Sequence, residues 1–204
     1  GGANVLTGAS AGLATADTLV TVAIAWTVAG LALCLLLGTY WHLPAARDGV
    51  RRAAISFAVG DLALWLAVAM VAAGSGSVSL DETTQATGWV AAVFGPVNFS
   101  AGLFRLAQIS FRRWLPITLA GPPPGAALLH AGVVNGGGIL LIRLSPLSTA
   151  DIAVAVTLAV GVASMLYGTL VSLVKPDVKG ALTYSTMAQM GFMMLTIGLG
   201  LWAA

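Results

Sequence analysis

The candidates for chemistry in this 204-residue chain are four charged or titratable residues within, or at the ends of, long apolar stretches: Asp61, Arg105, His130 and Lys179. An ionisable group inside a bilayer costs about 2.5 to 3.5 kcal/mol on insertion scales, and such groups commonly mark the path of an ion or a proton. The carboxyl, imidazole and amino groups can each take up and release a proton, whereas a guanidinium stays charged at any working pH. These residue types predict a proton relay of the three titratable side chains, with the arginine as a fixed charge near the path.

Two of these residues have an equally simple structural interpretation. Asp61 lies well inside its apolar stretch, where a carboxylate either pairs with a base from another helix or stays protonated because it is desolvated. Such a pair fixes helix packing without moving any proton. Arg105 follows Asn98 and Gly102 at helical offsets of seven and four, which places a polar stripe on one helix face. Arginine can also extend its guanidinium to the membrane surface and serve only as an anchor.

The other two residues follow breaks in the apolar pattern. His130 comes shortly after 121–125, where three consecutive prolines end any helix, and a histidine just inside a restarted helix suits proton transfer. A packed, hydrogen-bonded histidine is the alternative. Lys179 is followed by Thr183 and Thr186 at offsets of four and seven, and this polar face favours a position inside a helix bundle, because polar groups facing lipid are penalised. Anchoring at the membrane surface is the alternative for Lys179.

Composition identifies the solvent that surrounds most of the chain. Hydrophobic residues make up 58% and charged residues only 8%, against about 25% charged in an ordinary soluble domain. This excludes a soluble enzyme and a disordered chain, and the single cysteine excludes a disulfide scaffold. The net charge of +2 comes from bases that stand singly or in pairs, without the basic surface of a nucleic-acid-binding module. The sequence also has no Cys/His spacing typical of a metal site.

The apolar stretches predict an all-α membrane protein with a single transmembrane domain over 1–204. A bilayer span needs about 20 apolar residues. The first fourteen residues are too short for a span and are interpreted as the end of an earlier one. Windows of the required length predict six spans, at about 18–39, 54–73, 88–108, 126–144, 152–174 and 181–202, with a Pro/Gly break near 121–125 before the fourth.

Charge in the connections predicts the orientation of these spans. Cytoplasmic loops of membrane proteins carry an excess of Lys and Arg. The alternate loops at 40–53, 109–125 and 175–180 each contain two or three basic residues, while the connections at 74–87 and 145–150 are acidic or balanced. We therefore expect the three basic loops in the cytoplasm and both ends of the chain on the other side.

Two long motifs resemble a known family. The stretches WLP at 114–116 and GPPPGAALLHA at 121–131 resemble a segment of the antiporter-like subunits of respiratory complex I and of Mrp sodium/proton antiporters. The stretch DVKGALTYST at 177–186 is similar to a second segment of these subunits, and the two segments occur in the same order. The residues at 130–137 and 185–194 are most similar to those of the DabB group of this superfamily. This group comprises membrane subunits of inorganic-carbon accumulation complexes.

The resemblance implies an antiporter-like helix bundle in which buried residues move protons. Lys179 and His130 match the lysine and the histidine of the family segments, whereas Arg105 stands where the family has a lysine. Thr27 replaces a glutamate of the complex I and Mrp subunits, and Ala58 replaces an arginine that would lie three residues before Asp61 in the helix. The site set predicted from residues and resemblance is Lys179, His130 and Asp61, with Arg105 as a fixed charge and no metal ligands.

The function implied by the resemblance is transport rather than catalysis. A DabB-like subunit would conduct protons or sodium to drive CO2 hydration and bicarbonate trapping by a DabA-like partner, in a multi-pass complex of the bacterial inner membrane. Zinc is expected in that partner, and no cofactor in this chain. The alternatives are a proton-translocating subunit of an NADH:quinone oxidoreductase, similar to NADH dehydrogenase subunit 5, an Mrp-type Na+/H+ antiporter subunit, and a structural piece with no pathway of its own. Because the chain stops after six predicted spans, we expect it to be a fragment of a longer subunit.

Overall fold

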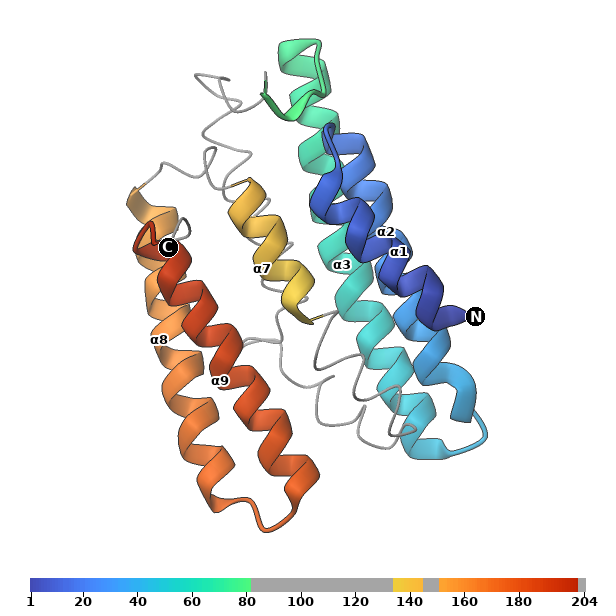
Figure 1. Ribbon diagram of the computed structural model, residues 1–204, viewed down its shortest axis with the longest axis vertical. Helices are drawn as coiled ribbons and strands as arrows, with labels where there is room; N and C mark the ends of the chain where they lie inside the picture. Colours follow the sequence, from blue (N-terminus) through green and yellow to red (C-terminus); the bar gives the residue numbers. More distant parts are fainter. Residues whose placement is uncertain (82–133, 145–150, 202–204) are drawn as a thin grey trace.

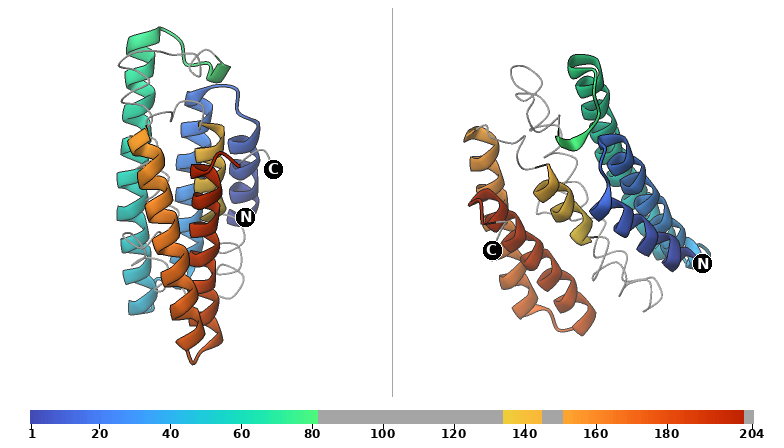
Figure 2. Two further views of the ribbon diagram at one scale, coloured as in Figure 1. Left: turned by 90° about the vertical axis from the view of Figure 1, so that its left-hand side faces the viewer. Right: turned by 45° about the horizontal axis from the view of Figure 1, so that its top comes forward.

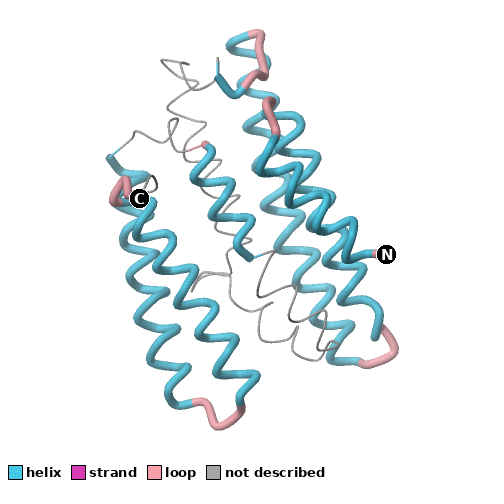
Figure 3. The backbone as a smooth tube through the Cα atoms, viewed as in Figure 1, coloured by secondary structure: helices cyan, strands magenta, loops and turns pink. Residues whose placement is uncertain are grey.

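The computed structural model describes residues 1–81, 134–144 and 151–201, and nearly all of them are helical (Figures 1 and 3). Within these ranges there is no strand, only an isolated antiparallel bridge between Thr18 and Ser79. The prediction of an all-α protein is therefore confirmed for the described residues. Their helices are α1 (Gly2–Thr15), α2 (Leu19–Leu37), the 3-10 turn η1 (Gly38–Tyr40), α3 (Pro44–Ser75), α7 (Val134–Arg143), α8 (Asp151–Val174) and α9 (Val178–Gly198).

Three of the described helices contain segments long and apolar enough to cross a membrane: Leu19–Leu37, Ala46–Gly74 and Val154–Val174. They overlap the spans predicted at 18–39, 54–73 and 152–174. Their apolar length follows from the sequence alone, since each segment has a mean hydropathy of 2.0 or more.

The helix bounds differ from the predicted spans where polar residues extend a helix beyond its apolar part. Helix α3 begins ten residues before the predicted span, because Pro44 stands at the start of the helix, where proline is favoured. Helix α9 begins at Val178, three residues before the predicted span at 181–202 begins. It ends at Gly198, four residues before the end of that span. The predicted span at 88–108, the Pro/Gly break and the first part of the span at 126–144 lie outside the described residues.

The described helices form two groups with α7 between them. Helices α1, α2 and α3 lie side by side in one group, and α8 and α9 form an antiparallel hairpin in the other (Figures 1 and 2). Helix α7 contacts α9 on one side and α1 on the other. This short helix therefore connects the N-terminal group with the C-terminal hairpin.

The basic segments gather at one end of the bundle. The connection from α2 to α3 and the connection from α8 to α9 both lie at the lower end in Figure 1, and the turn from α1 to α2 lies at the opposite end. Arg47, Arg51 and Arg52 occupy the first turns of α3, and Lys175 and Lys179 flank the start of α9. Two of the three basic loops thus share an end, as the positive-inside pattern predicts.

Glycines allow the two helices of the C-terminal hairpin to pack backbone against backbone. A Cβ atom on Gly168 of α8 would lie 2.7 Å from the backbone nitrogen of Ala188 and from the carbonyl oxygen of Tyr184 in α9. A Cβ on Gly161 would lie 2.9 Å from the backbone nitrogen of Leu195. Any side chain at these positions would push the helices apart, so small residues determine how closely α8 and α9 approach.

Hydrogen bonds join α7 to α1 at the end of the bundle opposite the basic segments. The Nη1 atom of Arg143, the last residue of α7, donates hydrogen bonds to the carbonyl oxygens of Leu13 at 3.0 Å and of Ala14 at 2.5 Å. The last carbonyls of a helix have no partner within it and carry partial negative charge. No basic residue lies in the last turn of α1 itself, so Arg143 supplies the cation from a helix far away in sequence. This contact fixes α7 to the N-terminal group.

Apolar side chains form two clusters stacked along the bundle. One cluster includes Leu33 of α2, Phe57 of α3, Leu141 of α7 and Met190 and Met194 of α9. The other joins the ends of the helices at the α1–α2 turn and includes the side chains of Leu19, Trp26, Leu64, Val71 and Leu140. Because α2, α3 and α7 contribute to both clusters, the level between the clusters lies partway along these helices.

Candidate functional site

Asp61 lies at the level between the two apolar clusters. It follows Phe57 of one cluster by four residues and precedes Leu64 of the other by three, so all three share one face of α3. Phe57 and Leu64 are buried and Asp61 is half-buried. From Ala53 to Gly74, Asp61 is the single ionisable residue of α3. The structure thus places a carboxyl group partway along an apolar helix and on its packed face.

A hydrogen bond between two helices lies close to the same level. The indole Nε1 of Trp65 donates to Oγ1 of Thr27 in α2 at 3.1 Å. Trp65 stands one helical turn after Asp61, about 6 Å further along α3. Thr27 lies in α2 between Trp26 of one cluster and Ala29 of the other. Asp61, Thr27 and Trp65 therefore form a polar layer, a name kept below for these three residues.

The sequence pattern singled out Thr27 but not Trp65. The family resemblance implies that Thr27 replaces a glutamate, and the structure shows the Thr27 hydroxyl as the acceptor for an indole of the next helix. Apart from its position, nothing in the sequence distinguishes Trp65 from the other apolar residues of this stretch. Its position four residues after Asp61 was the signal available, because residues four apart share a helix face.

Lys179 lies exposed in the first turn of α9, at the basic end of the bundle. Asp177 begins this helix as its N-cap, and its carboxylate accepts a hydrogen bond from the backbone nitrogen of Gly180 at 2.6 Å. Near Lys179, the ammonium of Lys175 stands 5.4 Å from the ring centre of Tyr184, within the range of a cation–π contact.

The polar face expected along α9 behaves differently from residue to residue. Thr183 is 1% exposed and faces the interior, as expected, whereas Lys179 is exposed. The hydroxyl of Thr183 donates to the carbonyl oxygen of Lys179 at 3.0 Å, and that of Thr186 to the carbonyl oxygen of Leu182 at 2.9 Å. Threonine commonly bonds in this way to the preceding turn of its own helix. These two bonds therefore lie within α9 and do not link it to another helix.

The structure does not bring Asp61 and Lys179 together. Asp61 is 17 residues after the start of α3, which corresponds to about 26 Å along the helix axis. Lys179 is in the first turn of α9, and both helices begin at the same end of the bundle (Figure 1). A relay between them would need groups at intermediate depth. His130 and Arg105, the other two predicted site residues, lie outside the described residues.

The fold and the polar layer define a class: membrane subunits built of packed apolar helices that carry an ionisable group at depth. A family described as "NADH:quinone oxidoreductase/Mrp antiporter, TM" matches residues 16–204. The chain belongs to this family, and it is an antiporter-like membrane subunit.

Individual relatives represent three branches of the family. The chain is 33% identical to the probable inorganic carbon transporter subunit DabB1 of Halothiobacillus neapolitanus, over 91% of this chain and 35% of the relative. It is 32% identical to NADH-quinone oxidoreductase subunit L of Mycobacterium tuberculosis, over 92% of this chain and 31% of the relative. A chain of the Mrp complex from a Dietzia species superposes with a TM-score of 0.89 and 28% identity, over 96% of this chain and 22% of that one. The chain thus spans about a third of the length of the curated relatives.

Proposed function

We propose that this chain is the part of a DabB-like subunit through which protons or sodium ions run, driving inorganic-carbon accumulation by a partner subunit in the bacterial inner membrane. The observation that carries the proposal is the position of Asp61, the single ionisable residue between Ala53 and Gly74 of an apolar helix, on the packed face and between two apolar clusters. A carboxyl group at such depth is costly, and proteins keep such groups mainly where ions or protons pass.

The roles proposed for Asp61 and Lys179 follow from the depth of these two residues in the bundle. Asp61 exchanges protons in the middle of the bundle, and Lys179 exchanges them with water at the basic end. His130 is proposed to connect these two levels, with Arg105 as a fixed charge that tunes its neighbours. Asp61 lies about 26 Å along α3 from the start of that helix, and this depth is the reason that a third titratable group is proposed.

The energy available from the membrane is sufficient for this coupling. One elementary charge that crosses a potential of 100 mV releases about 2.3 kcal/mol, which shifts an equilibrium by more than tenfold. The CO2 hydration itself is assigned to a DabA-like partner with bound zinc, and this chain is proposed to need no cofactor of its own.

Replacement of the family glutamate by Thr27 favours the carbon-transporter branch. A threonine that accepts the Trp65 indole at 3.1 Å cannot take up a proton as a glutamate would. Two other branches remain as the second candidate function: a proton-translocating subunit of an NADH:quinone oxidoreductase and an Mrp-type Na+/H+ antiporter. The similarity to subunit L and to the Mrp chain supports this second candidate.

The test is growth of a carbonic-anhydrase-deficient bacterium in air when it expresses the full-length protein with its DabA-like partner. We expect rescue by the wild type, and loss of rescue with Asp61→Asn, which keeps the shape of the side chain but cannot be ionised. Asp17→Asn is the matched control, because Asp17 is an exposed acid at the end of the bundle.

Two results would contradict parts of the proposal, and a third would indicate general damage. Full rescue by Asp61→Asn, at equal protein level in the membrane, would show that Asp61 is not on the path. No rescue by the wild type, together with Na+/H+ exchange in inverted membrane vesicles, would favour the Mrp branch. The same loss of rescue with Asp17→Asn as with Asp61→Asn would indicate general damage rather than a blocked path.

A further inference from the structure

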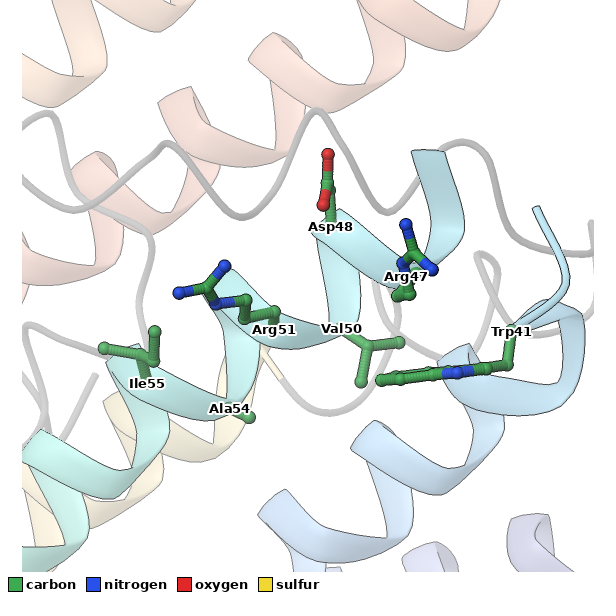
Figure 4. A pocket seen from close by; sticks show the side chains of 7 residues that line it. All are labelled: Trp41, Arg47, Asp48, Val50, Arg51, Ala54 and Ile55. Carbon is green, nitrogen blue, oxygen red and sulfur yellow. The ribbon is translucent and has the colours of Figure 1, made fainter. Parts of the chain in front are cut away.

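A cavity of about 580 Å³ opens at the start of α3, at the basic end of the bundle (Figure 4). It is lined by Trp41, which precedes the helix, and by residues of its first turns, among them Arg47 and Arg51. We propose that this cavity binds the phosphate headgroup of an anionic phospholipid, with one acyl chain of that lipid lying along α3. The lining of the cavity shares no residue with the polar layer or with the proposed path.

The charges around the cavity favour an anion. Arg47 and Arg51 are four residues apart on one side of α3, and both are exposed. The planar guanidinium group matches the geometry of a phosphate with two parallel hydrogen bonds. Asp48 also lines the cavity, but its carboxylate points away from the indole of Trp41 (Figure 4). With two guanidinium groups and one carboxylate, the lining keeps a net positive charge.

Trp41 identifies the depth of the cavity in the membrane. Trp41 is 54% exposed, and its ring lies beside Val50, which is buried (Figure 4). Tryptophan is enriched at the level of the lipid headgroups, where the ring meets apolar groups and the indole N–H meets polar ones. The apolar segment of α3 begins at Ala53, directly after the arginines. The two guanidinium groups therefore lie at headgroup level and the residues after them at the level of the acyl chains.

An exposed apolar stripe continues from the cavity along the same side of α3. Ile55, Val59, Leu62 and Leu66 follow one another at offsets of four, three and four, and all four are exposed, Leu62 by 71%. From Ile55 to Leu66 the stripe extends about 16 Å along the helix, which is about half of a 30 Å hydrocarbon core. This is the length of one leaflet, so the stripe fits one acyl chain.

A phospholipid is the ligand that satisfies the cavity and the stripe together. A free phosphate ion would pair with the arginines and leave the stripe uncovered. A neutral lipid would cover the stripe but leave the excess positive charge of the cavity without a counter-charge. An anionic amphiphile has a charged group for the arginines and an apolar chain for the stripe. These two parts follow each other in the same order as the arginines and the stripe along α3.

The experiment uses the full-length protein, purified in detergent, stripped of lipid and titrated separately with dioleoyl phosphatidylglycerol and dioleoyl phosphatidylcholine. Bound lipid is counted by native mass spectrometry. We expect tighter binding of phosphatidylglycerol, and about fivefold weaker binding of that lipid in each of Arg47→Gln and Arg51→Gln, the effect of one basic residue near an anionic surface. Arg52→Gln is the matched control, because Arg52 is adjacent but does not line the cavity.

A second variant separates lost binding from lost structure. Asp48→Asn removes the negative charge of the lining, so we expect it to strengthen phosphatidylglycerol binding, a gain that misfolding cannot produce. Unchanged phosphatidylglycerol affinity in both Arg47→Gln and Arg51→Gln, or a loss equal to theirs in Arg52→Gln, would overturn the proposal. Weaker binding in Asp48→Asn would do the same.

Two further outcomes would assign the surface to another ligand. Displacement of phosphatidylglycerol by millimolar inorganic phosphate would reduce the site to one for a free anion. Loss of co-purifying partner subunits in Arg47→Gln, with lipid binding unchanged, would make the surface a protein interface. Either result overturns lipid binding at this cavity, and neither bears on the rescue test of Asp61.

Discussion

The close contact of α8 with α9 gives the sharpest prediction about stability, which concerns Gly168→Ala. The added Cβ would stand 2.7 Å from two backbone atoms of α9, whereas ordinary van der Waals contact begins at 3.4 Å. Backbone atoms cannot rotate aside as a side chain can, so α9 must withdraw by the difference, about 0.7 Å. A gap of that size removes about a quarter to a half of the dispersion energy of the neighbouring contacts.

The expected cost of this withdrawal is about 1 to 3 kcal/mol, the usual range for overpacking. The measurement is the melting temperature of the full-length protein in detergent, followed by size-exclusion chromatography of a fluorescent fusion after heating. We expect Gly168→Ala to melt several degrees below the wild type. The matched control is Gly8→Ala in α1, where an added Cβ meets nothing within 4 Å.

The control is expected to shift the other way, because alanine is favoured over glycine inside a helix by about 0.8 to 1 kcal/mol. Gly8→Ala should therefore melt with the wild type or slightly above it. If Gly168→Ala and Gly8→Ala melted at the same temperature, the close approach of the helices at Gly168 would not contribute to the stability of the protein, and the prediction would be wrong.

Two further predictions concern hydrogen bonds between helices. Arg143→Met removes the donor from the last carbonyls of α1 and should cost about 1 to 3 kcal/mol, seen as a lower melting temperature; Arg143→Lys should recover only part of it, and equal stability of all three proteins would contradict the capping role. Thr27→Val removes the acceptor of the Trp65 indole and should cost about 0.5 to 1.5 kcal/mol, because water is scarce at that depth. Thr27→Ser keeps the acceptor and should melt near the wild type, so identical melting of the serine and valine variants would argue against a stabilising hydrogen bond.

Much of the fold could be predicted because it depends on local properties. An apolar run of the right length forms a helix wherever lipid is the solvent, since only a helix satisfies every backbone polar group within the segment. The positions of α2, α3 and α8 follow from this rule. The depth of Asp61 follows as well, because its place within the apolar run is also its place within the helix.

The same local reasoning failed for contacts between distant segments. Lys179 and Thr183 share a helical stripe in the sequence, yet Lys179 is exposed and Thr183 is buried, and only the packing of the helices decides which of them is covered. His130 and Arg105 stay predictions of the sequence and of the family resemblance.

The sequence by itself determined the solvent, the helical class, the end of the bundle that carries the basic residues, and the presence of a carboxyl group at depth. Only the tertiary structure decided that Trp65 donates to Thr27 across 38 residues and that Arg143 binds the end of α1 across 130. The physical reason is the range of the interactions. Hydropathy and helix periodicity act within one segment, whereas a hydrogen bond between helices depends on which faces meet when the helices pack.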